Sequence, residues 1–182
     1  MKKLMVAVAA IAMAVAANAS TFTWGISDGA LDTTKFAGAQ AILFYGPSAG
    51  SISLPDTTGW NDKTTAFKVA DLTGSGASQF RTGTIGTDGK FTADAEDIQK
   101  IDNKTGFFKF YMAVISEDGK NVALVTTTKS ARIAAATTAS SALWGSSGFS
   151  TFSVTGSDTP EPTSGLLLLL GVAGLALRRK AK

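Results

Sequence analysis

Acidic side chains form the densest group of residues in this chain that could do chemistry. Asp94, Glu96, Asp97 and Asp102 follow one another closely in the sequence. Carboxylate oxygens alone can bind Ca²⁺, so these residues are a weak candidate calcium site. Their spacing does not fit the EF-hand loop, and a solvated acidic turn is the simpler interpretation. We therefore expect no bound metal and no cofactor.

The chain contains no His and no Cys, and these absences exclude several kinds of catalysis. Ser-His-Asp and Cys-His nucleophilic sites cannot form. Zinc sites with His or Cys ligands and the two-His-one-carboxylate iron site are excluded in the same way. A pair of carboxylates facing each other across a cleft could still cleave a glycan, so a carboxylate-only glycan hydrolase or lyase is one alternative. Our main expectation is a protein that is not an enzyme.

Trp60 is the aromatic residue best placed in the sequence to contact a ligand. It follows Thr57-Thr58-Gly59 and precedes Asn61-Asp62, a composition typical of a loop. A flat aromatic ring with polar neighbours can stack on a sugar, which makes a carbohydrate-binding module a second alternative. A tryptophan that packs in the core, or as a lid over it, would give the same local pattern.

Short β-strands must position these residues, because alternating or continuous apolar runs bounded by Gly, Pro and Asp fill the middle of the chain. The clearest hairpin joins 107–115 to 121–126. Asp88-Gly89 predicts a second hairpin. The other expected strands are 21–26, 40–45, 51–54, 66–72, 79–85, 90–92 and 149–154.

Two stretches have a different pattern. Apolar residues recur every three positions in 93–101, which predicts one or two helical turns there. The stretch 131–148 is rich in Ala, Ser, Thr and Gly. We expect it to be a loop or a short helix that brings Leu143 and Trp144 onto the core.

Many short strands with Gly-rich turns and little helix indicate the all-β class. The expected architecture is an antiparallel β-sandwich or a partly closed barrel. One β-rich domain over 20–154, called the body below, is followed by a linker over 155–159.

The first nineteen residues have the pattern of a secretory signal peptide. A basic start, Met1-Lys2-Lys3, precedes an apolar run over 4–17, and Ala17-Asn18-Ala19 is a small-residue cleavage site. Ser20 is then the expected first residue of the mature protein, released by signal peptidase.

The end of the chain has three parts in a fixed order. Pro160-Glu161-Pro162 comes first, followed by an uncharged apolar run over 165–177 and a basic end that starts with Arg178-Arg179. We expect a membrane helix over about 164–177. At about 1.5 Å per residue it is shorter than a hydrocarbon core of about 30 Å. The basic end favours the cytoplasmic side.

These three parts resemble the PEP-CTERM sorting signal of Gram-negative bacteria. The resemblance covers residues 160–182 and implies no activity for the domain that carries the signal. It implies handling by a membrane-embedded exosortase and delivery to the cell surface or the extracellular matrix. Proteins with this signal are typically associated with exopolysaccharide and biofilm.

The positive net charge of the chain comes from its two ends. The whole chain has 17 Lys and Arg and 14 Asp and Glu, a net charge of +3. Six of these cations and one anion lie in the signal peptide and the tail. Residues 20–159 therefore retain 11 cations and 13 anions, a net charge of −2. We expect no binding to nucleic acid, which requires a basic patch on the folded domain.

Together, these patterns predict an exported protein that is anchored in the inner membrane during sorting and then reaches the surface or the matrix. We expect the β-rich body to have a structural or adhesive role, with exopolysaccharide as a partner.

Overall fold

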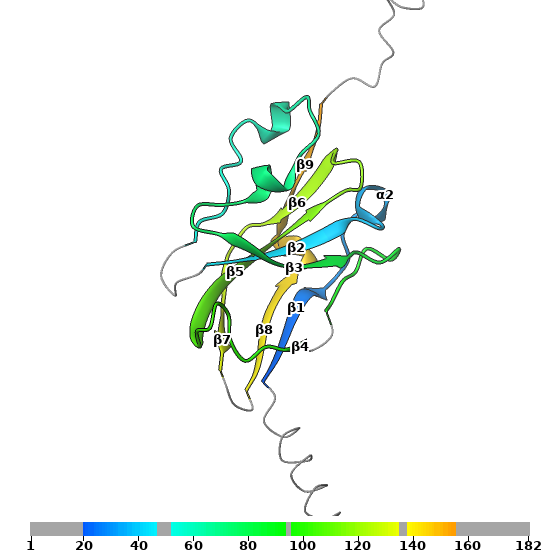
Figure 1. The fold of residues 1–182 in the computed structure, drawn as a ribbon. Coiled ribbons are helices and arrows are strands. Elements are labelled where there is room, and N and C mark those ends of the chain that lie inside the picture. Colours follow the sequence, from blue (N-terminus) through cyan, green and yellow to red (C-terminus); the bar gives the residue numbers. More distant parts are fainter. Residues whose placement is uncertain (1–19, 47–51, 94–95, 135–137, 156–182) are drawn as a thin grey trace, which may run out of the picture.

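The computed structural model describes residues 20–46, 52–93, 96–134 and 138–155. These residues are mostly β-strand in two sheets, with almost no helix, which confirms the all-β class (Figure 1). The strands are β1 Thr21–Asp28, β2 Gln40–Tyr45, β3 Ser78–Thr84, β4 Glu96–Asp97, β5 Gly106–Ile115, β6 Asn121–Val125, β7 Lys129–Ile133, β8 Ala139–Gly145 and β9 Phe149–Ser153. The helical elements are the one-turn helix α2 Thr33–Phe36 and the 3-10 helices η1 Trp60–Asp62, η2 Val69–Leu72 and η3 Ser146–Gly148.

The larger sheet is built around β5, the longest strand. The strand order is β3-β2-β5-β6-β9, and β7 also pairs with β5. Residues 113–115 of β5 pair with β6, whereas residues 106–110 pair with β7. Because β2 pairs with residues 110–115 along the other edge of β5, β6 and β7 follow one another along the same edge, both antiparallel to β5. The predicted hairpin from 107–115 to 121–126 is confirmed.

The smaller sheet has the order β4-β1-β8, and its central pair corrects the expectation of an antiparallel fold. β1 and β8 are parallel, with Thr21 opposite Ala139 and Ile26 opposite Trp144. A tight turn can join only antiparallel neighbours, whereas these two strands are separated by most of the body, so either direction is open to them.

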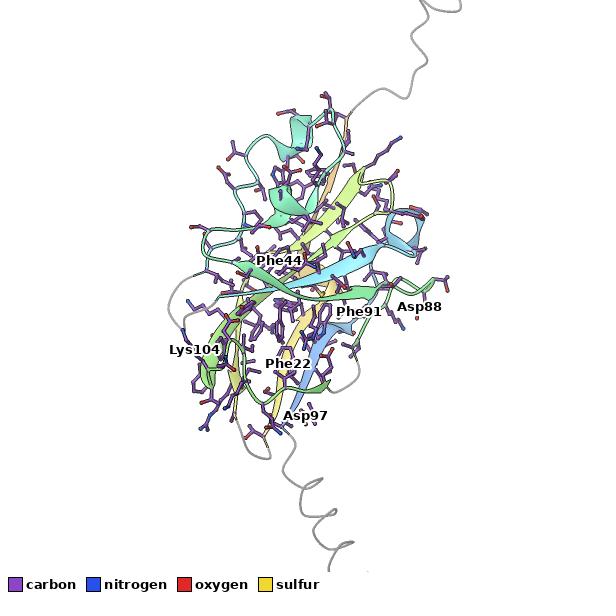
Figure 2. The ribbon with its side chains drawn as sticks, viewed as in Figure 1. Phe22, Phe44, Asp88, Phe91, Asp97 and Lys104 are labelled. Atoms are coloured by element: carbon purple, nitrogen blue, oxygen red, sulfur yellow. The ribbon has the colours of Figure 1, made fainter. Side chains whose placement is uncertain are left out.

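Aromatic side chains fill the space between the two sheets. Phe22 of β1 lies 5.1 Å from Phe110 of β5 and 6.4 Å from Phe80 of β3, measured between ring centroids. Figure 2 shows Phe22 between the strands of the two sheets. The described strands form no closed barrel. The contacts of Phe22 are those of two stacked sheets, as in a sandwich.

An irregular segment, residues 52–77, covers the outer face of the larger sheet. Tyr111 of β5 anchors it, because its hydroxyl donates to the Leu72 carbonyl at 2.9 Å and accepts from the Gly74 amide at 2.7 Å. Under this cover, the last six residues of β5, 110–115, are all buried, and they form a continuous apolar run.

The expected strands within this segment are wrong. Residues 52–54 lie outside the strands, and the stretch 66–72 ends in η2. Position 51 lies outside the described residues. Apolar and polar residues alternate in both stretches because single apolar side chains, such as Phe67 and Leu72, pack onto the outer face of the larger sheet.

Three other local predictions are corrected. The stretch 93–101 contains β4 rather than helical turns, and its described apolar residues Ile98 and Ile101 are buried. The stretch 131–148 contributes to β7 and contains β8, so Leu143 and Trp144 lie on a strand rather than on a loop or a helix, and only η3 at its end is helical. Asp88-Gly89 does form a turn, but 90–92 does not pair with β3 as a strand; Thr92 instead bridges to Gly25 of β1.

No helix within the described ranges is long and apolar enough to cross a membrane. The expected signal peptide over 1–19 and the expected membrane helix over about 164–177 lie outside the described residues.

Candidate functional site

Glu96 of the acidic cluster joins the two sheets rather than facing an open site. Its Oε2 accepts a hydrogen bond from Nε of Arg81 at 2.8 Å, which is also an ion pair. Glu96 lies on β4 of the smaller sheet and Arg81 on β3 of the larger one. The Arg81 guanidinium also lies over the Phe80 ring, 4.4 Å from its centroid. The pair therefore has a structural role at one edge of the sandwich.

Asp102 has a different partner. It forms a tight turn with Asn103, and both have positive φ angles, 51° and 60°. Two such residues in sequence are typical of a type I′ turn, which favours Asn and Asp. The Asp102 carboxylate accepts a hydrogen bond from the Tyr45 hydroxyl at 2.6 Å. This bond, together with burial, raises the pKa of Tyr45 to about 12.

The described acidic residues do not converge on a metal site. Asp97 is exposed on β4, and Figure 2 shows it at the end of the molecule where β1 begins. Asp94 lies outside the described residues. Within the described part of the chain, no three acidic side chains lie close enough together to hold a metal ion. The weak calcium candidate gains no support from the described geometry.

Trp60 is packed inside the body rather than displayed on its surface. Its side chain is 7% exposed. The ring centroid lies 5.2 Å from that of Phe67 and 5.0 Å from that of Phe152. Sugar stacking requires an exposed indole face, so this geometry favours the alternative interpretation of Trp60 as a residue that packs the cover against the larger sheet.

Most other carboxylates of the body organise turns. Side-chain oxygens of Asp32, Asp56 and Asp118 accept hydrogen bonds from backbone amides two residues further along the chain. Hydrogen bonds to Thr34, Thr58 and Ser116 are the main reason why the pKa values of these three carboxyls are lowered. A general acid needs the opposite shift, because it must hold its proton near neutral pH. Asp88 accepts from the Lys90 amide in the same way, whereas Asp71 accepts from the Lys68 amide three residues earlier in the chain.

Hollows on the surface contain acidic residues. One beside η2 and one beside α2 both hold Glu117 and Asp118, which are neighbours on a single turn. Another holds Asp28 and Asp88 from different segments, together with Lys90. Both of these aspartates are exposed. They lack the apolar surroundings that keep the general acid of a glycosidase protonated.

Sequence patterns did not identify Phe107 as a surface residue. It is 61% exposed, although it begins the strand with the strongest apolar character. The signal that could have revealed it is Lys109, two residues further along the same strand. Positions i and i+2 share one face of a strand, so a lysine there marks that part of the face as exposed to solvent.

The end of the body is fixed where the chain continues toward the tail. The backbone amide of Thr155 donates to the Lys63 carbonyl at 2.9 Å, and that of Val154 donates to the Lys120 carbonyl at 2.8 Å. β9 ends at the top of Figure 1, and β1 begins at the bottom. The two ends of the body therefore lie on opposite sides of the molecule.

Comparison with protein families assigns the tail. The model of the PEP-CTERM protein-sorting motif matches residues 158–180. This range includes the predicted sorting residues Pro160, Glu161, Pro162, Arg178 and Arg179, which lie outside the described residues. No curated protein and no solved structure matches the chain. The chain thus carries a PEP-CTERM protein-sorting motif, the mark of a secreted protein that is sorted by an exosortase, a membrane enzyme.

Proposed function

We propose that the body is a non-enzymatic domain with a structural or adhesive role at the cell surface or in the extracellular matrix of a Gram-negative bacterium. The observation that carries this proposal is the sorting motif at residues 158–180. An exported body linked to such a tail must act where the sorting pathway releases it. Signal peptidase would first cleave after Ala19, and the tail would then hold the protein in the inner membrane until the exosortase acts.

The character of the body supports a role without catalysis. The sequence has no His and no Cys to supply a general base or a nucleophilic thiol. Hydrogen bonds that hold turns in place lower the pKa values of the Asp32, Asp56 and Asp118 carboxyls. Phe22, Phe80 and Phe110 join the two sheets in a continuous aromatic core. Such a body is suited to persist outside the cell and to present a surface.

Cell fractionation with sorting variants tests the proposal. The double variant Pro160→Ala, Pro162→Ala should keep the protein in the inner membrane and remove it from the surface and matrix fractions. The matched control changes Thr159 and Thr163, which flank the motif, to Ala and should leave the distribution unchanged.

The role of the body is tested separately from its sorting. A strain that lacks the protein should lose surface attachment or matrix cohesion, and the wild-type chain should restore it while the double proline variant should not. Full attachment and cohesion in the deletion strain would reject the structural or adhesive role. Release of sugars from a polysaccharide by the purified protein, lost in Asp28→Asn or Asp88→Asn, would instead favour a glycan hydrolase.

A further inference from the structure

The lower ends of β5 and β7 leave one face of the larger sheet open to solvent, with an aromatic residue on it. Phe107 of β5 lies directly opposite Arg132 of β7, and Lys109 lies opposite Ser130. Residues that oppose each other in an antiparallel pair point to the same face of a sheet. Phe107, Lys109, Ser130 and Arg132 therefore share one face, which we call the Phe107 patch.

Burial confirms which side of the sheet this is. The alternating residues Phe108, Ala131 and Ile133 are at most 4% exposed and face the core. Phe107 is 61% exposed, and among the described residues it is the one large hydrophobic side chain that is exposed to solvent. The cover formed by residues 52–77 packs on Tyr111, further along β5, and leaves Phe107 uncovered.

The charge of the patch is opposite to that of the segment that contains it. Residues 106–110 and 129–133 contain no acidic residue, and their cations on the face of Phe107 are Lys109 and Arg132. Neither Lys109 nor Arg132 forms an ion pair with any described residue. Residues 20–159 as a whole have a net charge of −2. Lys109 and Arg132 are therefore available to an anionic ligand on the face that carries Phe107.

We propose that the Phe107 patch binds an acidic polysaccharide, with the Phe107 ring against the apolar face of a sugar and Lys109 and Arg132 at its carboxylate groups. Arginine pairs with carboxylates through two parallel hydrogen bonds, and lysine adds a point charge. An extended sugar chain can lie along the two paired strands. The proposal rests on the proposed function, since the ligand must be met outside the cell.

Position in the molecule favours a polysaccharide over a lipid surface. β5 starts and β7 ends at the bottom of Figure 1, whereas β9, which leads to the tail, ends at the top. The patch therefore faces away from the end of the body that the membrane holds. A single exposed phenylalanine also offers little apolar surface to insert into a bilayer.

The test measures binding of the full-length protein, purified in detergent, to polygalacturonate. We expect Phe107→Ala to weaken binding about tenfold, the equivalent of about 1.4 kcal/mol. The double variant Lys109→Gln, Arg132→Gln should weaken it at least as much and should reduce its dependence on salt, because exposed charges are screened by ions. Neutral dextran should not bind.

The matched control is the double variant Lys35→Gln, Lys90→Gln, which removes two exposed lysines outside the patch and changes the net charge equally. It should bind polygalacturonate as the wild type does. Equal loss in this control, or no binding by the wild type, would overturn the proposal. Binding to vesicles of anionic phospholipid without binding to polygalacturonate would also overturn it. The fractionation experiment is independent of these results, so failure of the patch and failure of the sorting role can be told apart.

Discussion

The hydroxyl of Tyr111 connects the irregular cover to the larger sheet, and its removal should be costly. Tyr111→Phe leaves the buried Leu72 carbonyl and Gly74 amide without their partner. An unsatisfied buried polar group costs about 1–3 kcal/mol, so we expect a loss of that size in urea unfolding. Tyr45→Phe is the matched control. Its partner Asp102 is exposed and can be rehydrated, so the loss should be under about 1 kcal/mol. Equal losses would contradict the anchoring role.

Both tyrosines also predict how stability changes in alkaline solution. Burial raises the pKa of Tyr111 to about 12. The pKa of Tyr45 is also raised to about 12, mainly because the Tyr45 hydroxyl donates a hydrogen bond to Asp102. The unfolded chain ionises its tyrosines near pH 10 and the folded chain near pH 12. Their contribution is therefore complete below pH 10 and is lost as the pH rises toward 12.

Unfolding free energies measured at pH 9 and pH 11.5 check this prediction. The wild type should lose more stability over this interval than Tyr111→Phe, and the double variant Tyr111→Phe, Tyr45→Phe should lose least. Identical losses in all three proteins would show that neither tyrosine ionises differently in the folded state.

At the scale of elements, Gly25 allows the chain at residues 91–92 to lie against β1. Its φ is +140°, and a Cβ at this position would lie 2.4 Å from the Phe91 carbonyl oxygen and 2.7 Å from the Thr92 Cα. These are backbone atoms with no room to move. We expect Gly25→Ala to cost about 4 kcal/mol or more in urea unfolding. Gly106→Ala is the control, since Gly106 has φ +130° with no atom within 4 Å of the added Cβ. It should cost only the backbone strain, about 1–3 kcal/mol. A smaller loss for Gly25→Ala than for Gly106→Ala would contradict this packing.

The elements that the sequence predicts well are those whose pattern is local. β2 was predicted within its observed bounds, and the hairpin of β5 and β6 follows from an apolar run and a Gly turn. β8 was missed because its run of Ala and Ser has low strand propensity, and pairing with β1, far away in the sequence, determines its conformation. The sequence pattern around Trp60 left open whether this residue is buried, because its burial depends on contact with Phe152 of β9, which is distant in the sequence.

At the scale of the whole molecule, the sorting motif lies close to a fixed point of the body. The backbone amide of Thr155 donates to the Lys63 carbonyl, and the five Cα–Cα steps from Thr155 to Pro160 can span at most about 18 Å. We therefore expect the exosortase to act close to the surface that carries η1. Deletion of Gly156 and Ser157 should lower the processed fraction several-fold, as measured on immunoblots. Insertion of Gly-Ser at the same point should leave it unchanged. Normal processing of the deletion variant would contradict this limit on reach.

The tail could be identified from sequence because its function depends on linear order, with Pro160-Glu161-Pro162 before an apolar run and Arg178-Arg179 after it. The surface of the body could not be read in the same way. Exposure of Phe107 depends on where the cover over β5 stops, and the pairing of Phe107 with Arg132 depends on the register of β7. Both are properties of the folded molecule rather than of a local pattern.

The intact mass of the protein recovered from the surface and matrix fractions of its host tests the central claim most directly. We predict a polypeptide that begins at Ser20 and ends near Pro160, and its absence from a strain that lacks the exosortase. A protein that keeps residues 165–182 and remains in the inner membrane of the wild-type host would contradict the account, because the tail would then act as a permanent anchor.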